Sequence, residues 1–235
     1  NDADRGNVMR ASALWKILPS ILPIVLITVL GLMSFAVLGV TEFNRERGHL
    51  EENLMQMVTA LEKAVDMKLE SVVQATAMLV ASNRDLIEQR DFATLYSNLS
   101  KAESEEKFID HFALVDQSGQ QVMNTVVPWG SPLPISRNRE RYAASFATGR
   151  SFVSELGIGT ITKQHEIYIV VPVIEHGQTV FVLVTVLKSS SLAGILSELH
   201  LAQDWVGNIF DSWGFVVART RDQDKFIGHK VSQRL

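Results

Sequence analysis

The sequence predicts an α+β protein in which an N-terminal transmembrane helix and a long stalk helix precede a mixed five-stranded sheet with flanking helices. Three observations support this prediction. Residues 17–41 form an uncharged run long enough to cross a bilayer. Residues 42–83 contain no proline, and their apolar residues recur at intervals of three and four. Beyond residue 108, short apolar segments are separated by Asp-x-x-Gly and His-Gly turns, which is the pattern of β-hairpins.

Residues 17–41 are expected to form an uncleaved transmembrane helix. About 20 apolar residues are enough to cross the hydrocarbon core of a bilayer. A cleaved signal peptide is the alternative, but its apolar region is usually about half as long as this run. A buried helix of a soluble protein would show a polar stripe, which this run lacks. We therefore expect the chain to be anchored in a membrane.

The charges on either side of this run predict its orientation. Before it lie Arg5, Arg10 and Lys16. After it lie Glu42, Arg45, Glu46, Arg47, Glu51 and Glu52. Positively charged flanks tend to stay in the cytoplasm. Residues 1–16 are therefore expected to be cytoplasmic and those after 41 periplasmic, with the span in a bacterial inner membrane.

Residues 42–83 are expected to form one long stalk helix. A helix of about 40 residues reaches roughly 60 Å, which suits a stalk that carries a module away from the membrane. Its apolar seam predicts a homodimer through a parallel coiled coil between Leu50 and Leu61. In the later turns the apolar residues cover a wider face, so docking on the globular part is the alternative there.

Short helices and strands are expected after the stalk. Asp91 is placed to cap a short helix, because its side chain can accept a hydrogen bond from a free N–H group of the first turn. Gly149 is placed to end a second helix. Five strands are expected at residues 112–116, 120–125, 152–156, 166–173 and 179–187. Residues 84–190 would then form one module.

One hairpin pattern occurs twice, as FALVDQSGQQVMNT and as NIFDSWGFVVART. Asp116 and Asp211 occupy the same place in the two copies, and Gly119 and Gly214 follow three positions later. An aspartate at the start of a tight turn usually accepts hydrogen bonds from its own backbone, and glycine supplies the positive φ. We therefore expect turn residues here, and an incomplete second module at residues 191–235.

Composition and motifs exclude several functional classes. The formal net charge of −4 argues against a nucleic-acid-binding surface, which is normally basic. The chain has no cysteine, which excludes thiolate catalysis and cysteine-based metal sites. No phosphate-binding loop, dinucleotide-binding, hydrolase or zinc-protease motif occurs, and His165, His176 and His200 lie on separate predicted elements. We expect no cofactor, no metal and no catalytic residue in this chain.

The order of these elements resembles a known family. The span, the long helix and the segments LVDQSGQQVMNT, RERYAASFATGRSFVSE, IYIVVPVIEHGQTVFVLVTVLKSSSLAGIL and DSWGFVVARTRDQDKFIG are together similar to the double Cache sensor domains of bacterial membrane receptors. The sensor histidine kinases of that group are the most similar. The resemblance implies two extracytoplasmic PAS-like modules, a membrane-distal one that binds a small molecule and a membrane-proximal one. It also implies a cytoplasmic output domain, with a diguanylate cyclase or a chemoreceptor as the alternative to a kinase.

The segment RNRERYAASF is the best candidate for a ligand site. An arginine can grip a carboxylate through two parallel hydrogen bonds. In double Cache domains an Arg-x-aromatic-aromatic element holds the carboxylate of the ligand, and the resemblance places Arg139 and Tyr142 in this element. Arg141 stands where an aromatic residue is usual, so small organic acids or other anions are expected rather than amino acids. Tyr168 and Trp129 complete the candidate site, whereas a solvated basic helix face is the alternative for the arginines.

Two functional hypotheses follow. The first is a ligand-sensing input region that signals through the stalk helix. The second is a periplasmic protein-interaction module without a small ligand. A membrane-anchored enzyme has no motif to support it.

Overall fold

The computed structural model describes residues 33–35, 52–198 and 205–231. The chain divides into two compact units, Asn1–Val58 and Thr59–Leu235, and the fold below is that of the second unit. Apart from residues 33–35, which are helical, the predicted transmembrane segment lies outside the described residues, as do residues 1–16 and the first part of the stalk. None of the helices in the described ranges is long and apolar enough to cross a bilayer.

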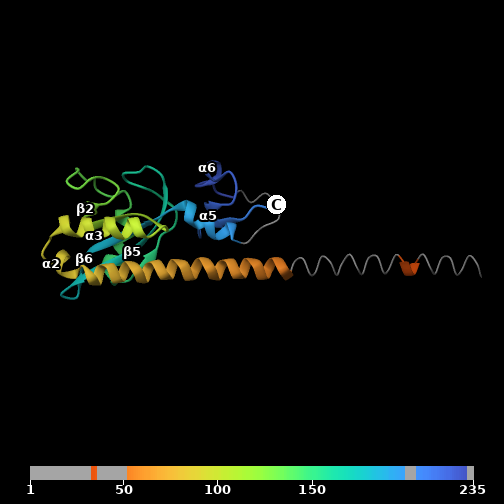
Figure 1. The fold of residues 1–235 in the computed structure, drawn as a ribbon, viewed down its shortest axis with the longest axis horizontal. Coiled ribbons are helices and arrows are strands. Elements are labelled where there is room, and N and C mark those ends of the chain that lie inside the picture. The colour runs from red at the N-terminus through yellow and green to blue at the C-terminus, as the bar shows by residue number, and fades with distance from the viewer. Residues whose placement is uncertain (1–32, 36–51, 199–204, 232–235) are drawn as a thin grey trace, which may run out of the picture. The chain divides into compact units, whose positions relative to one another are not determined.

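Helices open the described part of the chain. Residues 52–82 are helical, and α2 (Arg84–Glu88) and α3 (Phe92–Glu105) follow. The cap predicted for α3 is confirmed, because the Asp91 carboxylate accepts a hydrogen bond from the Thr94 N–H at 3.1 Å. Asn83 ends the long helix and accepts a hydrogen bond from the Asn98 amide at 2.7 Å, which joins it to α3. Figure 1 shows α3 beside the part of the long helix that belongs to this unit.

A six-stranded sheet forms the centre of the unit. Its strands are β1 (Ile109–Asp116), β2 (Gln121–Asn124), β3 (Phe152–Val153), β4 (Gly157–Ile158), β5 (His165–Glu175) and β6 (Gln178–Leu187). The order is β2-β1-β6-β5-β3, with β4 also paired to β5. Positive φ angles at His176 and Gly177 make the tight turn between the two longest strands.

The prediction of a mixed sheet is wrong, because every strand pair of this sheet is antiparallel. The pairs β1–β2 and β5–β6 are hairpins, whose strands necessarily run in opposite directions. Strand β6 then lies between β5 and β1 and runs antiparallel to both. Strands β1 and β5 run in the same direction and are separated by β6.

The strand predicted at residues 152–156 is interrupted, which gives six strands in place of five. The break falls at Glu155 and Leu156, whose backbone groups bond outside the sheet. The Arg141 guanidinium donates to both carbonyls, at 3.2 and 3.3 Å. The Leu156 N–H donates to the Asp211 carboxylate at 3.1 Å. Backbone groups bonded in this way cannot also serve a sheet ladder.

The two faces of the sheet carry two separate apolar clusters, as the alternation of side chains along a strand requires. On β1, Phe112 and Leu114 belong to the larger cluster, and Ala113 and Val115 belong to the smaller one. The larger cluster also includes residues of the long helix, α2, α3 and α5. On this face, the buried hydroxyls of Thr76 and Thr185 join the long helix to β6 at 2.9 Å. This face is therefore the structural core.

Helix α4 (Arg139–Thr148) covers part of the other face. Gly149, with φ of 64°, ends it as predicted. Its buried Tyr142 meets Tyr168 of β5 edge to face, with ring centroids 5.8 Å apart. The smaller apolar cluster lies around these two rings. Helix α4 therefore forms one wall of a space whose other wall is this face of the sheet.

The last described segments are α5 (Ser189–Ser197), β7 (Asn208–Phe210), β8 (Val216–Arg219) and α6 (Gln223–Phe226). Strands β7 and β8 form the predicted second hairpin, which makes a two-stranded sheet of its own. Leu192 and Leu196 of α5 and Val217 and Ala218 of β8 are buried in the larger apolar cluster. The second hairpin therefore packs against α5 and contributes to the larger apolar cluster, and the division of the chain into two modules stays a prediction.

Candidate functional site

A small space, which we call the inner cavity, lies between α4 and the sheet. Its volume is about 30 Å³. Its polar lining includes His111 on β1, Asn124 on β2, Tyr142 on α4, and Glu166 and Tyr168 on β5. Such a volume holds little more than one or two water-sized groups, so this is a site for a small molecule or for one end of a larger one.

Strand alternation explains why these residues meet. Residues two apart on a strand point to the same face, which brings Glu166 and Tyr168 together. Tyr168 pairs across the sheet with Val186 of β6, and Val186 pairs with His111 of β1. The side chains of Tyr168, Val186 and His111 therefore form one row across the face of the sheet that lines the cavity. Ala113 and Val184 form the next row and also line the cavity.

Two titratable groups of the cavity differ in how they are paired. His111 is buried, and its Nδ1 lies 2.9 Å from the Asp110 carboxylate. This hydrogen bond holds the pKa of Asp110 below its usual value. Glu166 is 8% exposed, and its carboxylate accepts a hydrogen bond from the Thr162 hydroxyl. Burial raises the pKa of Glu166, because the charged form loses solvation that one neutral donor does not replace.

The two tyrosine hydroxyls also differ. The Tyr142 hydroxyl lies 3.2 Å from the Ser136 hydroxyl, in a buried pair. The Tyr168 hydroxyl is buried and makes no hydrogen bond of good geometry within the described residues, but the nearby Arg141 guanidinium partly offsets the rise of its pKa. Burial raises the pKa of both phenols, so both keep their protons at neutral pH. An unpaired buried hydroxyl is costly, so a ligand that bonds to Tyr168 would recover part of this cost.

The structure brings two of the five predicted site residues into the inner cavity, namely Tyr142 and Tyr168. Arg139 is exposed, and its Cβ lies against the turn at Gly119. Arg141 donates to backbone carbonyls and lies over the Trp213 ring, with 5.2 Å from the guanidinium carbon to the ring centroid. Neither arginine lines the inner cavity.

Trp129 lies apart from the other predicted residues. Its side chain is 48% exposed, and its ring centroid lies 5.7 Å from that of Tyr96 on α3. It lines a separate space of about 80 Å³ with Pro128 and Leu133. The structure therefore places Trp129 in the loop after β2, packed on α3.

Sequence reasoning missed Glu166, His111 and Asn124. One signal was available: Glu166 precedes a long apolar run and lies two positions before Tyr168, so the two share a face on any strand that contains both. His111 and Asn124 depend on the pairing of β1 with β2 and β6, which the sequence does not contain.

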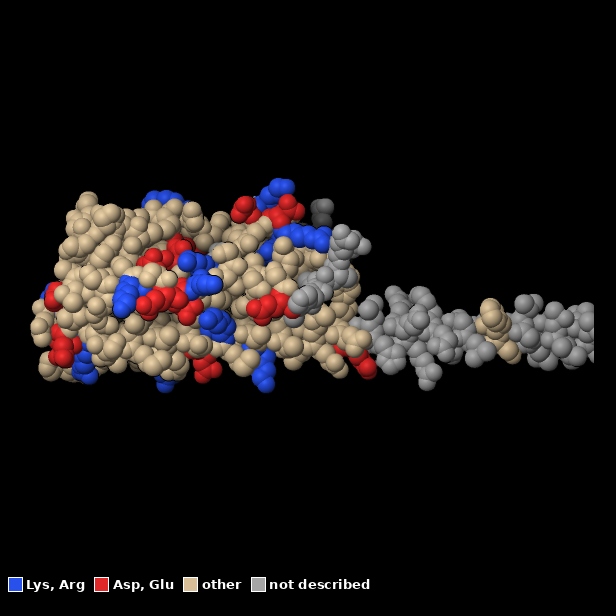
Figure 2. All heavy atoms as spheres, viewed as in Figure 1, with Lys and Arg blue, Asp and Glu red and all other residues tan. Residues whose placement is uncertain are grey.

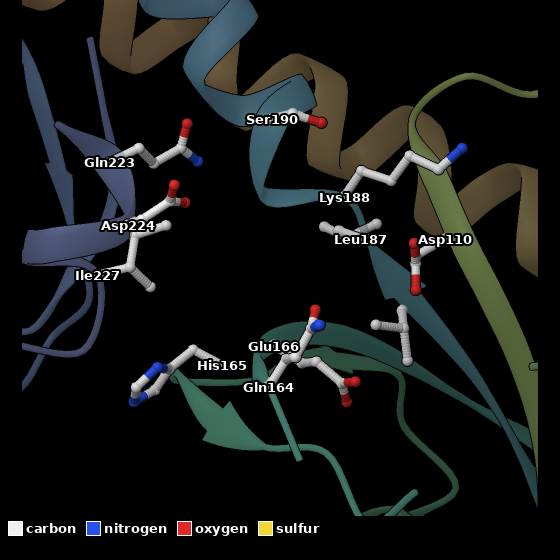
Figure 3. Close-up of a pocket in the computed structure, with 11 residues that line it drawn as sticks. Asp110, Gln164, His165, Glu166, Leu187, Lys188, Ser190, Gln223, Asp224 and Ile227 are labelled. Atoms are coloured by element: carbon white, nitrogen blue, oxygen red, sulfur yellow. The ribbon is translucent and has the colours of Figure 1, made fainter. Parts of the chain in front are cut away.

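A larger space, which we call the outer cavity, adjoins the inner one. Its volume is about 490 Å³, and it lies between the starts of β1, β5 and α5 and helix α6. Glu166 and Val186 line both cavities. Figure 3 shows Glu166 and Gln164 on one side of the outer cavity and Gln223 and Asp224 on another. The described residues contain no group of three or more metal-binding side chains.

Comparison with solved structures identifies the fold. No protein-family model matches the sequence, and no curated protein matches it. The sensor domain of the histidine kinase DctB from Vibrio cholerae is similar in structure, with a TM-score of 0.60, 12% identity, and coverage of 77% of this chain and 70% of that one. The chain has the fold of a bacterial sensor domain. The resemblance inferred from the sequence is thus confirmed for the fold.

Two further structures share this fold with other receptor types. The ligand-binding domain of the Pseudomonas fluorescens chemoreceptor CtaA in complex with L-serine has a TM-score of 0.57 and 18% identity, covering 78% of this chain and 77% of that one. A domain of a putative sensory box/GGDEF family protein from Vibrio parahaemolyticus has a TM-score of 0.55 and 13% identity, covering 71% and 70%. The same fold therefore occurs in proteins with three kinds of output.

Proposed function

We propose that this chain contains the ligand-sensing input domain of a bacterial membrane receptor and that the inner cavity binds a small molecule. The unpaired, buried hydroxyl of Tyr168 is the observation that carries this proposal. Tyr168 lines the inner cavity together with other polar groups, and a ligand that bonds to its hydroxyl would make a hydrogen bond that the described residues do not make. The sensor-domain neighbours support the same function.

The proposal extends to the rest of the receptor. Residues 17–41 would anchor it in the inner membrane, residues 1–16 would be cytoplasmic, and the sensing domain would be periplasmic. The stalk helix would form a homodimer and carry the signal as a small shift between two arrangements. The output would be a histidine kinase, since the DctB domain has the highest TM-score of the three neighbours described above. A chemoreceptor or a diguanylate cyclase is the alternative, supported by the other two.

Ligand screening of the purified chain in mild detergent tests the sensing function. We expect at least one compound from a panel of amines, carboxylates and amino acids to raise the melting temperature, because binding to the folded state alone stabilises it. Tyr168→Phe should lower the affinity for that compound by about tenfold, which is the effect of one lost hydrogen bond.

The matched control is Tyr96→Phe, which removes a hydroxyl that donates to the Val127 carbonyl on the other side of the sheet. It should leave ligand binding unchanged. If Tyr168→Phe binds every compound as tightly as the parent chain, the inner cavity is not the ligand site.

One cysteine variant tests both orientation and dimerisation. The chain has no cysteine, and Val58 is 56% exposed, so Val58→Cys introduces a single accessible thiol. We expect a membrane-impermeant maleimide to label it in cells whose outer membrane has been permeabilised, and mild oxidation to yield a disulfide-linked dimer. Labelling only after the inner membrane is broken would contradict the periplasmic location, and a chain that stays monomeric on oxidation would contradict the stalk dimer.

A further inference from the structure

We propose that one buried hydrogen bond, between the hydroxyls of Thr76 and Thr185, sets the register of the long helix on the sheet. Thr76 lies on the helix of residues 52–82, and Thr185 lies on β6, the middle strand of the sheet. The two hydroxyl oxygens are 2.9 Å apart. This inference rests on the proposed function only for its role in signalling, because the register itself can be tested without a ligand.

Apolar groups surround the Thr185 hydroxyl. Both threonines are 0% exposed, so neither side chain is accessible to solvent. On the neighbouring strands, Thr185 pairs with Phe112 of β1 and Ile169 of β5, which are also fully buried and belong to the larger apolar cluster. A buried hydroxyl without a partner is costly, so Thr185 depends on the hydroxyl of the helix.

The docked face of the long helix has a single position that can supply this hydroxyl. Val72 and Thr76 are the two buried positions in residues 52–82. Val72 and Val73 lie one turn before Thr76 and Val80 lies one turn after it, all against the larger apolar cluster. A shift of the helix by one turn, about 5.4 Å, would therefore place an aliphatic side chain opposite Thr185. Apolar contacts are not directional, so the hydrogen bond is what distinguishes one register from the next.

Two polar contacts nearer the ends of the docked segment are less restrictive. Lys68 Nζ lies 3.8 Å from a carboxylate oxygen of Glu106, and both side chains are partly exposed. Figure 2 shows acidic and basic side chains interspersed on the face in view, so a shifted lysine would find other partners. The amide of Asn98, which donates to Asn83, belongs to an exposed residue, so water can replace it. The buried pair therefore restricts the helix most.

Strand β6 connects this pair to the inner cavity. Val184 and Val186, the neighbours of Thr185 on the strand, point to the opposite face of the sheet and line the inner cavity. In the proposed receptor, a ligand that displaces this part of β6 would act directly on the bond that holds the stalk. Because the bond is either formed or broken, the helix would change between discrete registers.

The distance between two spin labels on the full-length chain in detergent tests the register. The chain has no cysteine, so Glu62→Cys on the long helix and Ser97→Cys on α3, both at exposed positions, supply the two attachment sites. An excess of cysteine-free chain restricts the measured distances to single chains. We expect one narrow distance distribution. Replacing both threonines by valine should broaden it or shift it by up to about 5 Å, the length of one helical turn.

Thr185→Ser is the matched control for this measurement. It removes one methyl group and keeps the hydroxyl, so the narrow distribution should remain. If Thr76→Val/Thr185→Val gives the same narrow distribution as the parent chain, the inference is overturned, because apolar packing alone would then set the register.

Melting temperatures show whether the variants are folded and whether the two hydroxyls depend on each other. Thr76→Val leaves the Thr185 hydroxyl among apolar groups, so we expect it to melt about 5 °C below the parent chain. Thr185→Val should cost less, because Thr76 can turn its hydroxyl to the carbonyl of Val72. The double variant should melt within about 2 °C of the parent chain, since no hydroxyl stays unpaired. Losses that simply add in the double variant would overturn the inference.

The outcomes separate this inference from the proposed function. Both tests use the ligand-free chain, so their result stands even if the ligand screen yields no compound. A compound found in that screen should change the label distance in the parent chain, and it should stabilise the double variant without producing the same step. If it changes the distance equally in both proteins, the pair has no role in signalling, while the sensing function stands.

Discussion

The two Asp–Gly hairpins of this protein share one turn but have different surroundings. In the β1–β2 hairpin, Asp116 Oδ1 accepts hydrogen bonds from backbone N–H groups two and four residues later, at 2.9 and 3.0 Å. In the β7–β8 hairpin, Asp211 Oδ1 accepts the equivalent bonds at 3.1 and 2.8 Å. Gly119 and Gly214 have φ angles of 88° and 81°. The turn chemistry predicted from the sequence is confirmed in both copies.

The difference lies in what each turn contacts. In the described part of the chain, every hydrogen bond of the Asp116 carboxylate stays within its own turn. The second turn is a joint: Asp211 Oδ2 accepts from the Leu156 N–H, and the Glu155 carboxylate accepts from the Ser212 N–H at 2.9 Å. The motif therefore fixes the shape of the turn, and the neighbouring chain decides whether it also connects two parts of the molecule.

The glycines should give the largest contrast between the hairpins. A Cβ at Gly119 would lie 2.6 Å from the Cβ of Arg139, so alanine there meets both a clash and an unfavourable φ. At Gly214 the nearest atom, on Lys230, is 3.9 Å away, so alanine meets only the unfavourable φ. We expect Gly119→Ala to lower the free energy of unfolding by about 2 to 3 kcal/mol and Gly214→Ala by about 1 kcal/mol. Urea denaturation measures both, and equal losses would contradict the close packing at Gly119.

Replacing the two aspartates should give the opposite contrast, with the larger loss of stability in the second hairpin. Asp116→Ala removes the hydrogen bonds of one turn, which we expect to cost about 1 kcal/mol. Asp211→Ala removes the equivalent bonds and the bond to Leu156, so a loss of about 2 kcal/mol is expected.

Amide hydrogen exchange tests whether the Asp211 turn is held to Leu156 through this hydrogen bond. The Leu156 amide should exchange faster in Asp211→Ala and unchanged in Asp116→Ala. If the Leu156 amide is equally protected in the two variants, the second turn does not connect the hairpin to Leu156 through Asp211.

Local signals predicted much of the fold. The Asp91 cap, the Gly149 helix end and the two Asp–Gly turns depend on residues within a few positions of one another, and all were predicted correctly. The antiparallel sheet was not predicted, because the position of β6 between β5 and β1 depends on pairing between strands about 70 residues apart in sequence.

The candidate site was predictable only in part for the same reason. Tyr142 and Tyr168 reach the inner cavity, but Glu166 and His111 join them through the register of β1, β5 and β6. The arginines show a further limit. Charge and spacing indicated an anion site, whereas α4 places Arg139 outward and aims Arg141 at Glu155 and Leu156. The sequence of a helical segment does not show which of its charged side chains will donate hydrogen bonds to backbone carbonyls elsewhere in the fold.

The two arginines give the test with the smallest expected effect on stability. Arg139 lies against the turn of the β1–β2 hairpin, and Arg141 lies against the turn of the β7–β8 hairpin. Arg141 lies over the Trp213 ring and donates to two carbonyls, so Arg141→Ala should lower the free energy of unfolding by about 1 kcal/mol. Arg139→Ala keeps the Cβ that packs on Gly119, so its effect should stay within about 0.5 kcal/mol. Trp213 fluorescence, followed with the other three tryptophans replaced by phenylalanine, should change in Arg141→Ala alone. A change of the same size in Arg139→Ala would mean that the first turn is also coupled to the second hairpin.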